Sequence, residues 1–152
     1  MYWRRRLTRL ELALYAAVVG IALLAFFERA LHYMEIAERT AVEVTIANVN
    51  SALALRSARG LLAGRAAESA SNPFALTGAP PNYLGAVSGA ELDTFARRVW
   101  LFDEERNEVV YLPRHMRTLH SDEPAKVVRF KQVWRGGVQK LVPTDTWRWS
   151  ER

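Results

Sequence analysis

The chain has 152 residues, of which 50% are apolar and 24% are charged, and its formal net charge is +5. This composition excludes a disordered chain, and the length fits one small domain beside any membrane segment. Because the sequence contains no cysteine, disulfides, thiolate nucleophiles and cysteine-ligated metals are excluded.

An uninterrupted apolar stretch runs from Leu10 to Phe27, with Glu11 as its only charged residue. At ~1.5 Å per residue its length approaches the ~30 Å hydrocarbon core of a bilayer. We predict a transmembrane helix over 10–27, because a helix in a soluble core needs only one apolar face. Residues 1–9 form a basic stub, which predicts a cytoplasmic N-terminus and a head on the outer side of the membrane. No small-residue cleavage site follows, which favours an uncleaved anchor over a signal peptide.

Residues 28–65 predict an amphipathic continuation of this helix, because good helix formers dominate and no proline occurs before Pro73. Apolar residues recur at spacings of four, three and four, which places them on one helical face. These head-packing candidates are Val42, Ile46, Val49 and Leu53. The stripe predicts that this half of the helix lies against a folded head.

Residues 66–96 are rich in turn-forming residues and carry scattered apolar anchors, which predicts a packed connector. Residues 97–152 then change to a strand pattern, with Gly136-Gly137 as a hairpin signal. Candidate strands are residues 99–102, 109–112, 126–134 and 138–142. The predicted fold class is α+β, with the long N-terminal helix packed on a small antiparallel sheet of three or four strands.

The segment Leu7-Thr8-Arg9-Leu10-Glu11-Leu12, followed by the apolar helix, is similar to the start of type IV pilins and type II secretion pseudopilins. Thr8, Glu11 and Leu12 match the motif of that family. The resemblance implies a structural subunit of the bacterial inner membrane that assembles through its N-terminal helix. Its partners would be copies of itself, other pilin-like subunits, and the pilus or secretion machinery. Arg6 stands where the family has the glycine required for cleavage, so we expect the N-terminus to stay uncleaved.

Five residues are candidates for assembly. A carboxylate inside a membrane span is costly and usually functional, which singles out Glu11. The resemblance implies that Glu11 pairs with a positive group of a neighbouring subunit, and Arg9 or Arg6 could supply that charge. The alternative is a carboxylate in the first helical turn that only reaches the headgroups. Ala16 and Gly20 fit the small-xxx-small spacing of close helix contacts, although such residues are common in membrane helices.

No catalytic motif, cofactor site or metal site is recognisable, so we expect no enzyme. Histidines and carboxylates between residues 115 and 123 lack a metal-binding spacing and favour a solvated loop. Basic residues lie among tryptophans near the predicted sheet, and the candidates for an anionic or nucleic-acid surface are Arg129, Lys131, Arg135 and Lys140. A solvated face over core tryptophans is the alternative that we favour.

We therefore expect a pilin-like subunit with a cytoplasmic N-terminus and a periplasmic head, which could reach an extracellular filament after assembly. The alternative is a single-pass protein that does not assemble and whose periplasmic head binds a partner. Binding of DNA by a basic head would be a special use of the first hypothesis.

Overall fold

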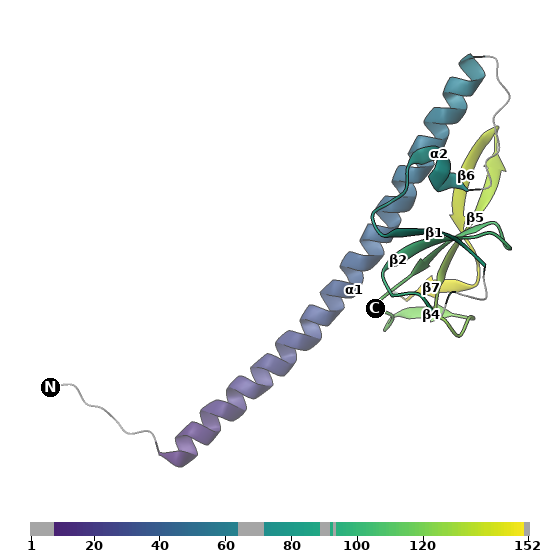
Figure 1. Ribbon diagram of the computed structural model, residues 1–152. Coiled ribbons are helices and arrows are strands. Elements are labelled where there is room, and N and C mark those ends of the chain that lie inside the picture. Colours follow the sequence, from purple (N-terminus) through teal and green to yellow (C-terminus); the bar gives the residue numbers. More distant parts are fainter. Residues whose placement is uncertain (1–7, 64–71, 89–91, 93, 151–152) are drawn as a thin grey trace. The chain divides into compact units, whose positions relative to one another are not determined.

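The computed structural model describes residues 8–63, 72–88, 92 and 94–150 (Figure 1). Within these ranges the chain is α+β, with two helices and seven strands. The elements are α1 (Arg9–Leu62), α2 (Pro73–Thr77), β1 (Tyr83–Val87), β2 (Val99–Asp103), β3 (Glu108–Leu112), β4 (Leu119–Ser121), β5 (Val128–Arg135), β6 (Val138–Pro143) and β7 (Trp147–Trp149). The chain divides into two compact units, Met1–Ala37 and Glu38–Arg152, and we call the second the head. The head therefore contains the second half of α1.

Five strands form one sheet in the order β1-β2-β3-β5-β6. β1 pairs with β2 in parallel, and the other neighbours are antiparallel. β5 and β6 form a hairpin in which Arg135 lies opposite Val138, and both glycines of its turn have positive φ. β4 and β7 pair in a separate two-stranded sheet. The predicted antiparallel core of β2, β3, β5 and β6 is thus confirmed.

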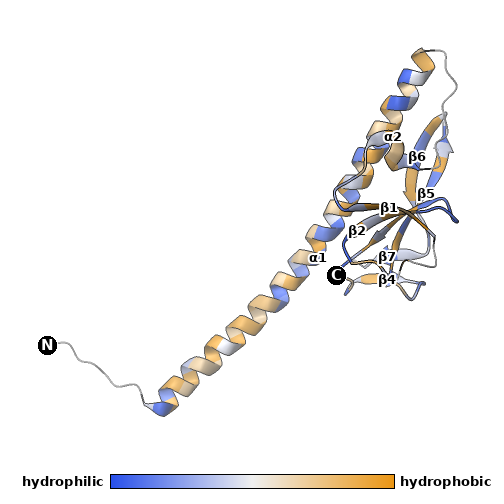
Figure 2. Ribbon diagram, viewed as in Figure 1, coloured by the Kyte–Doolittle hydropathy of each residue, from blue (hydrophilic) through white to orange (hydrophobic). Residues whose placement is uncertain are grey.

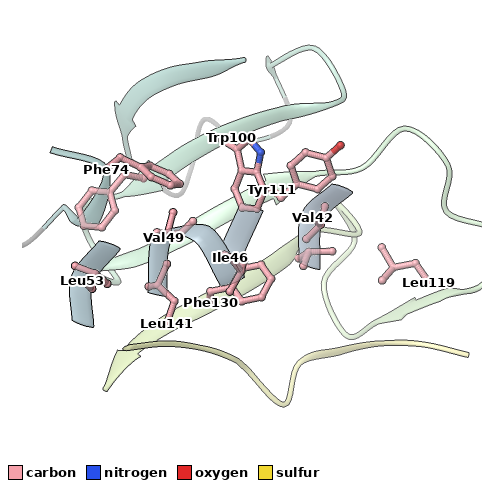
Figure 3. Close-up of a cluster of buried hydrophobic side chains, with 13 residues drawn as sticks. Val42, Ile46, Val49, Leu53, Phe74, Trp100, Tyr111, Leu119, Phe130 and Leu141 are labelled. Atoms are coloured by element: carbon pink, nitrogen blue, oxygen red, sulfur yellow. The ribbon is translucent and has the colours of Figure 1, made fainter. Parts of the chain in front are cut away.

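The main core lies between α1 and one face of the sheet (Figure 3). Val42, Ile46, Val49 and Leu53 are all buried in it, as the helical stripe in the sequence predicted. Their partners from the sheet are aromatic and aliphatic residues, among them Trp100, Tyr111, Phe130 and Leu141. Removal of these apolar side chains from water stabilises the packing of α1 on the sheet.

The opposite face of the sheet is covered as well. Leu101, Val110, Leu112 and Val127 are buried in a second apolar cluster, which also contains Leu92. Both faces of the central strands are therefore apolar, and this explains why β2 reads as a continuous apolar run and not as an alternating one.

The outer edge of β6 is closed by a side chain of α1. The amide of Asn50 accepts a hydrogen bond from the Leu141 N–H at 2.7 Å and donates one to the Leu141 carbonyl at 3.0 Å. Pro143 has no N–H to offer at the same edge. Because open strand edges invite pairing with other chains, this contact both fixes the helix on the sheet and protects the edge.

The predicted connector is more ordered than its composition indicated. Its described residues contribute the short helix α2 and the edge strand β1. The sequence analysis did not predict β4 and β7, because strands of three residues carry almost no periodic signal. The remaining parts of the predicted connector, at 66–71 and at 89–91 and 93, lie outside the described residues.

Candidate functional site

The first half of α1 presents an apolar surface on all sides. Between Leu10 and Phe27 every residue is exposed except Gly20, which is partly buried. In Figure 2 this part of the helix is coloured predominantly as hydrophobic. The helix is long and apolar enough to cross a membrane, and none of its most apolar window is buried within the chain. α1 therefore contains a candidate membrane span.

Glu11 closes the N-terminus of α1. Its carboxylate accepts hydrogen bonds from the N–H of Thr8 at 2.7 Å and from the Thr8 hydroxyl at 3.0 Å. The Glu11 N–H in turn donates to Thr8 Oγ1 at 3.3 Å. This is a capping box, in which the two residues satisfy each other's free backbone donors. The Thr-x-x-Glu spacing was visible in the sequence, and it gives Glu11 a structural role within its own chain.

The other assembly candidates are exposed where the structure describes them. Arg9 begins α1 and forms no ion pair with any described residue, so its guanidinium is available to another molecule. Arg6 lies outside the described residues. Ala16 is exposed, and a Cβ added at Gly20 would meet nothing within 4 Å. The small residues of this face are therefore not required by packing against the described residues of the chain.

A second surface of α1 lies in the head. From Val44 to Leu55 the helix has no charged residue, although the sheet covers only one side of it. Val44 and Leu55 are 52% and 53% exposed. Two hydroxyls of this segment are satisfied inside the helix, since Thr45 donates to the Ala41 carbonyl and Ser51 to the Ala47 carbonyl, both at 2.8 Å. We call Val44–Leu55 the uncharged segment.

Glu38 anchors the first turn of α1 in the head to the loop after β3. Its carboxylate accepts hydrogen bonds from the Tyr111 hydroxyl, the N–H groups of Arg114 and His115, and His115 Nδ1, at 2.8–2.9 Å. Burial alone would raise the pKa of Glu38, but these donors outweigh burial and lower it. Burial and the neighbouring Glu38 carboxylate raise the pKa of the Tyr111 hydroxyl. No local sequence pattern predicts this cluster, because Glu38 lies 73 to 77 positions before its partners.

Arg129 is not part of a binding surface, contrary to the sequence prediction. Its guanidinium is 3% exposed and donates to Asp103 at 2.8 Å and to both carboxylate oxygens of Glu123, at 2.6 and 3.0 Å. Glu108 lies 3.5 Å away from the same guanidinium. The prediction was wrong because alternation along a strand does not show which polar residue a loop covers. The loop after β4 places Glu123 against Arg129 and buries it.

Lys131, Arg135 and Lys140 remain exposed and lie on one face of the β5–β6 hairpin, since Lys140 is opposite Val133. That face is not uniformly basic. Glu108 lies directly opposite Lys131, and it follows the acidic turn between β2 and β3, which contains Glu104 and Glu105. The structure therefore brings three of the four basic candidates together but places carboxylates beside them, which weakens any attraction for a polyanion.

The histidines and carboxylates between residues 115 and 123, which could have suggested a metal site, contact different partners. His115 binds Glu38, His120 contacts the Thr118 carbonyl, and Glu123 holds Arg129. Among the described residues, no three histidine or carboxylate side chains are grouped so that they could hold a metal ion.

Comparison with known proteins does not assign this architecture to a family. No protein-family model, curated protein or solved structure matches the chain.

Proposed function

We propose that this chain is a pilin-like or pseudopilin-like structural subunit. It is anchored in the bacterial inner membrane and assembles through α1 into a pilus or a secretion pseudopilus. The N-terminus lies in the cytoplasm and the head in the periplasm, which is the orientation favoured by the arginines before the span. The observation that carries the proposal is the uncharged segment, which leaves Val44 and Leu55 exposed on α1 without a charged residue between them.

The uncharged segment argues for a neighbouring helix. A helix that only covers a sheet normally carries charge on its outer face. Here the exposed Val44 and Leu55 have no charged residue between them, and the hydroxyl of Ser51 is turned back to its own helix. Such a surface is suited to a second α1, and the open face around Gly20 offers a similar surface within the span.

A non-assembling anchored protein with a partner-binding head is the second candidate, and the capping box favours it. Because Thr8 already satisfies the Glu11 carboxylate, this residue needs no partner subunit to explain its presence. The two candidates therefore differ in one respect: whether the negative charge of Glu11 does anything beyond the capping of its own helix.

Substitution by glutamine separates charge from capping. Glutamine also serves at this position of a capping box, so Glu11→Gln keeps the cap and removes the charge. Glu11→Ala loses both, and the cap alone is worth about 1 kcal/mol. If Glu11 pairs with Arg9 of a neighbour in an apolar bundle, loss of the charge costs on the order of 3–5 kcal/mol.

The readout is cross-linking between copies that carry Gly20→Cys, in membranes that contain the partner machinery. The proposal predicts strong cross-linking with Glu11 and a similar loss for Glu11→Gln and Glu11→Ala. Equal cross-linking for Glu11 and Glu11→Gln, with a modest loss for Glu11→Ala, would reduce Glu11 to a helix cap. Absence of cross-linking with the native Glu11 would contradict assembly through the span.

A further inference from the structure

An open pocket of about 610 Å³ lies at the two-stranded sheet of the head, and we call it the β4–β7 pocket. Its volume is within the usual range of ligand sites, about 300–1,000 Å³, but most such sites are lined by apolar side chains. Here the lining carries ionisable groups of both signs. They are Arg117, His120, Asp122, Lys126, Asp145 and Arg148. The pocket is therefore suited to a charged group and not to an apolar one.

The backbone around the pocket is held in place by hydrogen bonds. The N–H of Asp122, just after β4, donates to the Thr146 carbonyl at 3.0 Å, just before β7. The buried Arg129 holds both sides of the pocket. Its guanidinium binds Glu123, and its carbonyl accepts a hydrogen bond from Trp147 Nε1 at 2.8 Å. The walls of the pocket are therefore fixed without a ligand.

The permanent charges that line the pocket have no partners within the described part of the chain. Arg117, Lys126 and Arg148 form no ion pair with any described residue. The carboxylates of Asp122 and Asp145 form none with those residues either. Opposite charges thus line one pocket without meeting each other. A ligand that carries both an anion and a cation would pair with both kinds.

Lys126 has a backbone conformation that lysine adopts rarely. Its φ is 47°, in the left-handed region that favours glycine or asparagine. The N–H of Lys126 donates to the Glu123 carbonyl at 3.0 Å, which closes the turn after β4. Residues held in this region are found preferentially at functional sites. A charged side chain at a position where glycine would be easier therefore supports a role for its ammonium group in the pocket.

The two kinds of charge fit the two parts of a zwitterion. Arg148 lies opposite His120 in the β4–β7 pairing, so both side chains project from the same face of this sheet. The planar fork of a guanidinium matches the oxygens of a phosphate. The carboxylates of Asp122 and Asp145 accept the hydrogen bonds that an ammonium donates. A phosphate and an ammonium in one ligand would satisfy both sets.

The pocket adjoins the part of the head in which α1 enters. Glu38, the first residue of the head, accepts hydrogen bonds from the N–H groups of Arg114 and His115 at 2.8 and 2.9 Å. Arg117, in the same loop, lines the pocket. Phe27 ends the candidate span eleven residues before Glu38, which limits their separation to roughly 40 Å in any arrangement. The chain therefore allows the pocket to reach the headgroup layer of the membrane.

We propose that the β4–β7 pocket binds a zwitterionic group made of a phosphate and an ammonium, such as the phosphoethanolamine headgroup of a phospholipid. The phosphate meets the cations of the pocket and the ammonium meets its carboxylates. The source is either a lipid of the bilayer that holds α1 or a soluble zwitterion, since both carry this chemistry. The inference goes beyond the proposed function and applies equally to an anchored head that does not assemble. Its failure would not count against assembly through α1.

The test is calorimetric titration of the full chain in detergent micelles with glycerophosphoethanolamine, the soluble headgroup of phosphatidylethanolamine. We expect saturable binding. Glycerophosphoglycerol, which lacks the ammonium, and ethanolamine, which lacks the phosphate, should both bind more weakly. Phosphatidylethanolamine mixed into the micelles should compete if the pocket takes a lipid, whereas binding unaffected by that lipid assigns the pocket to a soluble zwitterion.

Two variants separate the halves of the ligand. Arg148→Gln and Asp145→Asn should each weaken the binding of glycerophosphoethanolamine by roughly tenfold, because each removes a charge-assisted hydrogen bond. Asp145→Asn should not weaken the binding of glycerophosphoglycerol, which has no ammonium to lose. The matched controls are Arg135→Gln and Glu104→Gln, which remove the same charges from exposed positions outside the pocket. Both should leave the affinity unchanged, and urea unfolding checks that each variant is folded.

Absence of saturable binding would overturn the inference. Equal affinity for glycerophosphoethanolamine and glycerophosphoglycerol would refute recognition of the ammonium. An equal effect of Arg148→Gln and Arg135→Gln would show that only net charge attracts the ligand, and it would refute the assignment to this pocket.

Discussion

Removal of the Arg129 guanidinium should be among the most damaging single changes in the head. Arg129→Met keeps much of the side-chain volume but leaves Asp103, which is fully buried, without a cation. Breaking a buried pair by removing one partner costs about 3–5 kcal/mol. Glu123 would also lose the group that holds its loop on the sheet. This loss is a large part of the total stability of a small domain.

The matched control is Lys131→Met, two residues along the same face of β5, where the side chain is exposed. Its effect should lie within about 0.5 kcal/mol of zero. Urea unfolding of the detergent-solubilised chain, followed by tryptophan fluorescence, measures both changes. Asp103→Asn should recover part of the loss in the double variant, because it neutralises the unpaired carboxylate. Equal stability of Arg129→Met and Lys131→Met would refute the assignment of Arg129 to a buried ion cluster.

Four further outcomes follow from the fold and the charge pattern. Because the pKa of Glu38 is lowered from its ordinary value of 4.5, its contribution to stability is present above that value and is lost as the pH falls through the folded pKa; urea unfolding at a series of pH values should show a smaller acid loss for Glu38→Gln. Residues 30–152 should fold alone, and Ile46→Asp should lower their melting temperature strongly by burying an unpaired charge; an unchanged melting temperature would contradict the packing face. A reporter that is active only outside the cytoplasm should be active when fused after Arg152, and an inactive fusion would contradict the topology. Intact mass spectrometry should find Met1 retained or removed alone, whereas a methylated Leu7 at the N-terminus would show that Arg6 does not prevent cleavage.

The sequence predicted the parts of the fold that depend on long periodic patterns. The spacing of Val42, Ile46, Val49 and Leu53 placed one face of α1 against the sheet, because side chains three and four residues apart share a helical face. The apolar runs of β2 and β3 and the alternation of β5 likewise predicted strands at these positions. By contrast, β1 alternates in burial but not in sequence, because Y-L-G-A-V contains no charged or strongly polar residue to mark the exposed positions. β4 and β7 are too short to carry a pattern.

The errors at the candidate sites have a common physical cause. Whether a polar residue on a strand faces water depends on segments far away in the sequence, as Glu123 over Arg129 and Glu38 beneath Tyr111 show. A local sequence pattern cannot predict hydrogen bonds between residues that are far apart in the chain. The capping box of Thr8 and Glu11 was also missed, although its signal, Thr-x-x-Glu, lies within four residues and could have been found in the sequence.

Assembly through α1 is tested most directly by single cysteines placed in turn along residues 12–27 and 44–55, with cross-linking between copies measured in native membranes. The proposed function predicts yields that rise and fall with a period of about 3.6 residues. The maxima should fall at Ala16 and Gly20 in the span, and at Val44, Ser51 and Leu55 in the head, where the sheet leaves α1 uncovered. Buried positions such as Val49 should give none. Uniformly absent or non-periodic cross-linking along both stretches would contradict a helix-packed assembly and leave an anchored head that acts alone.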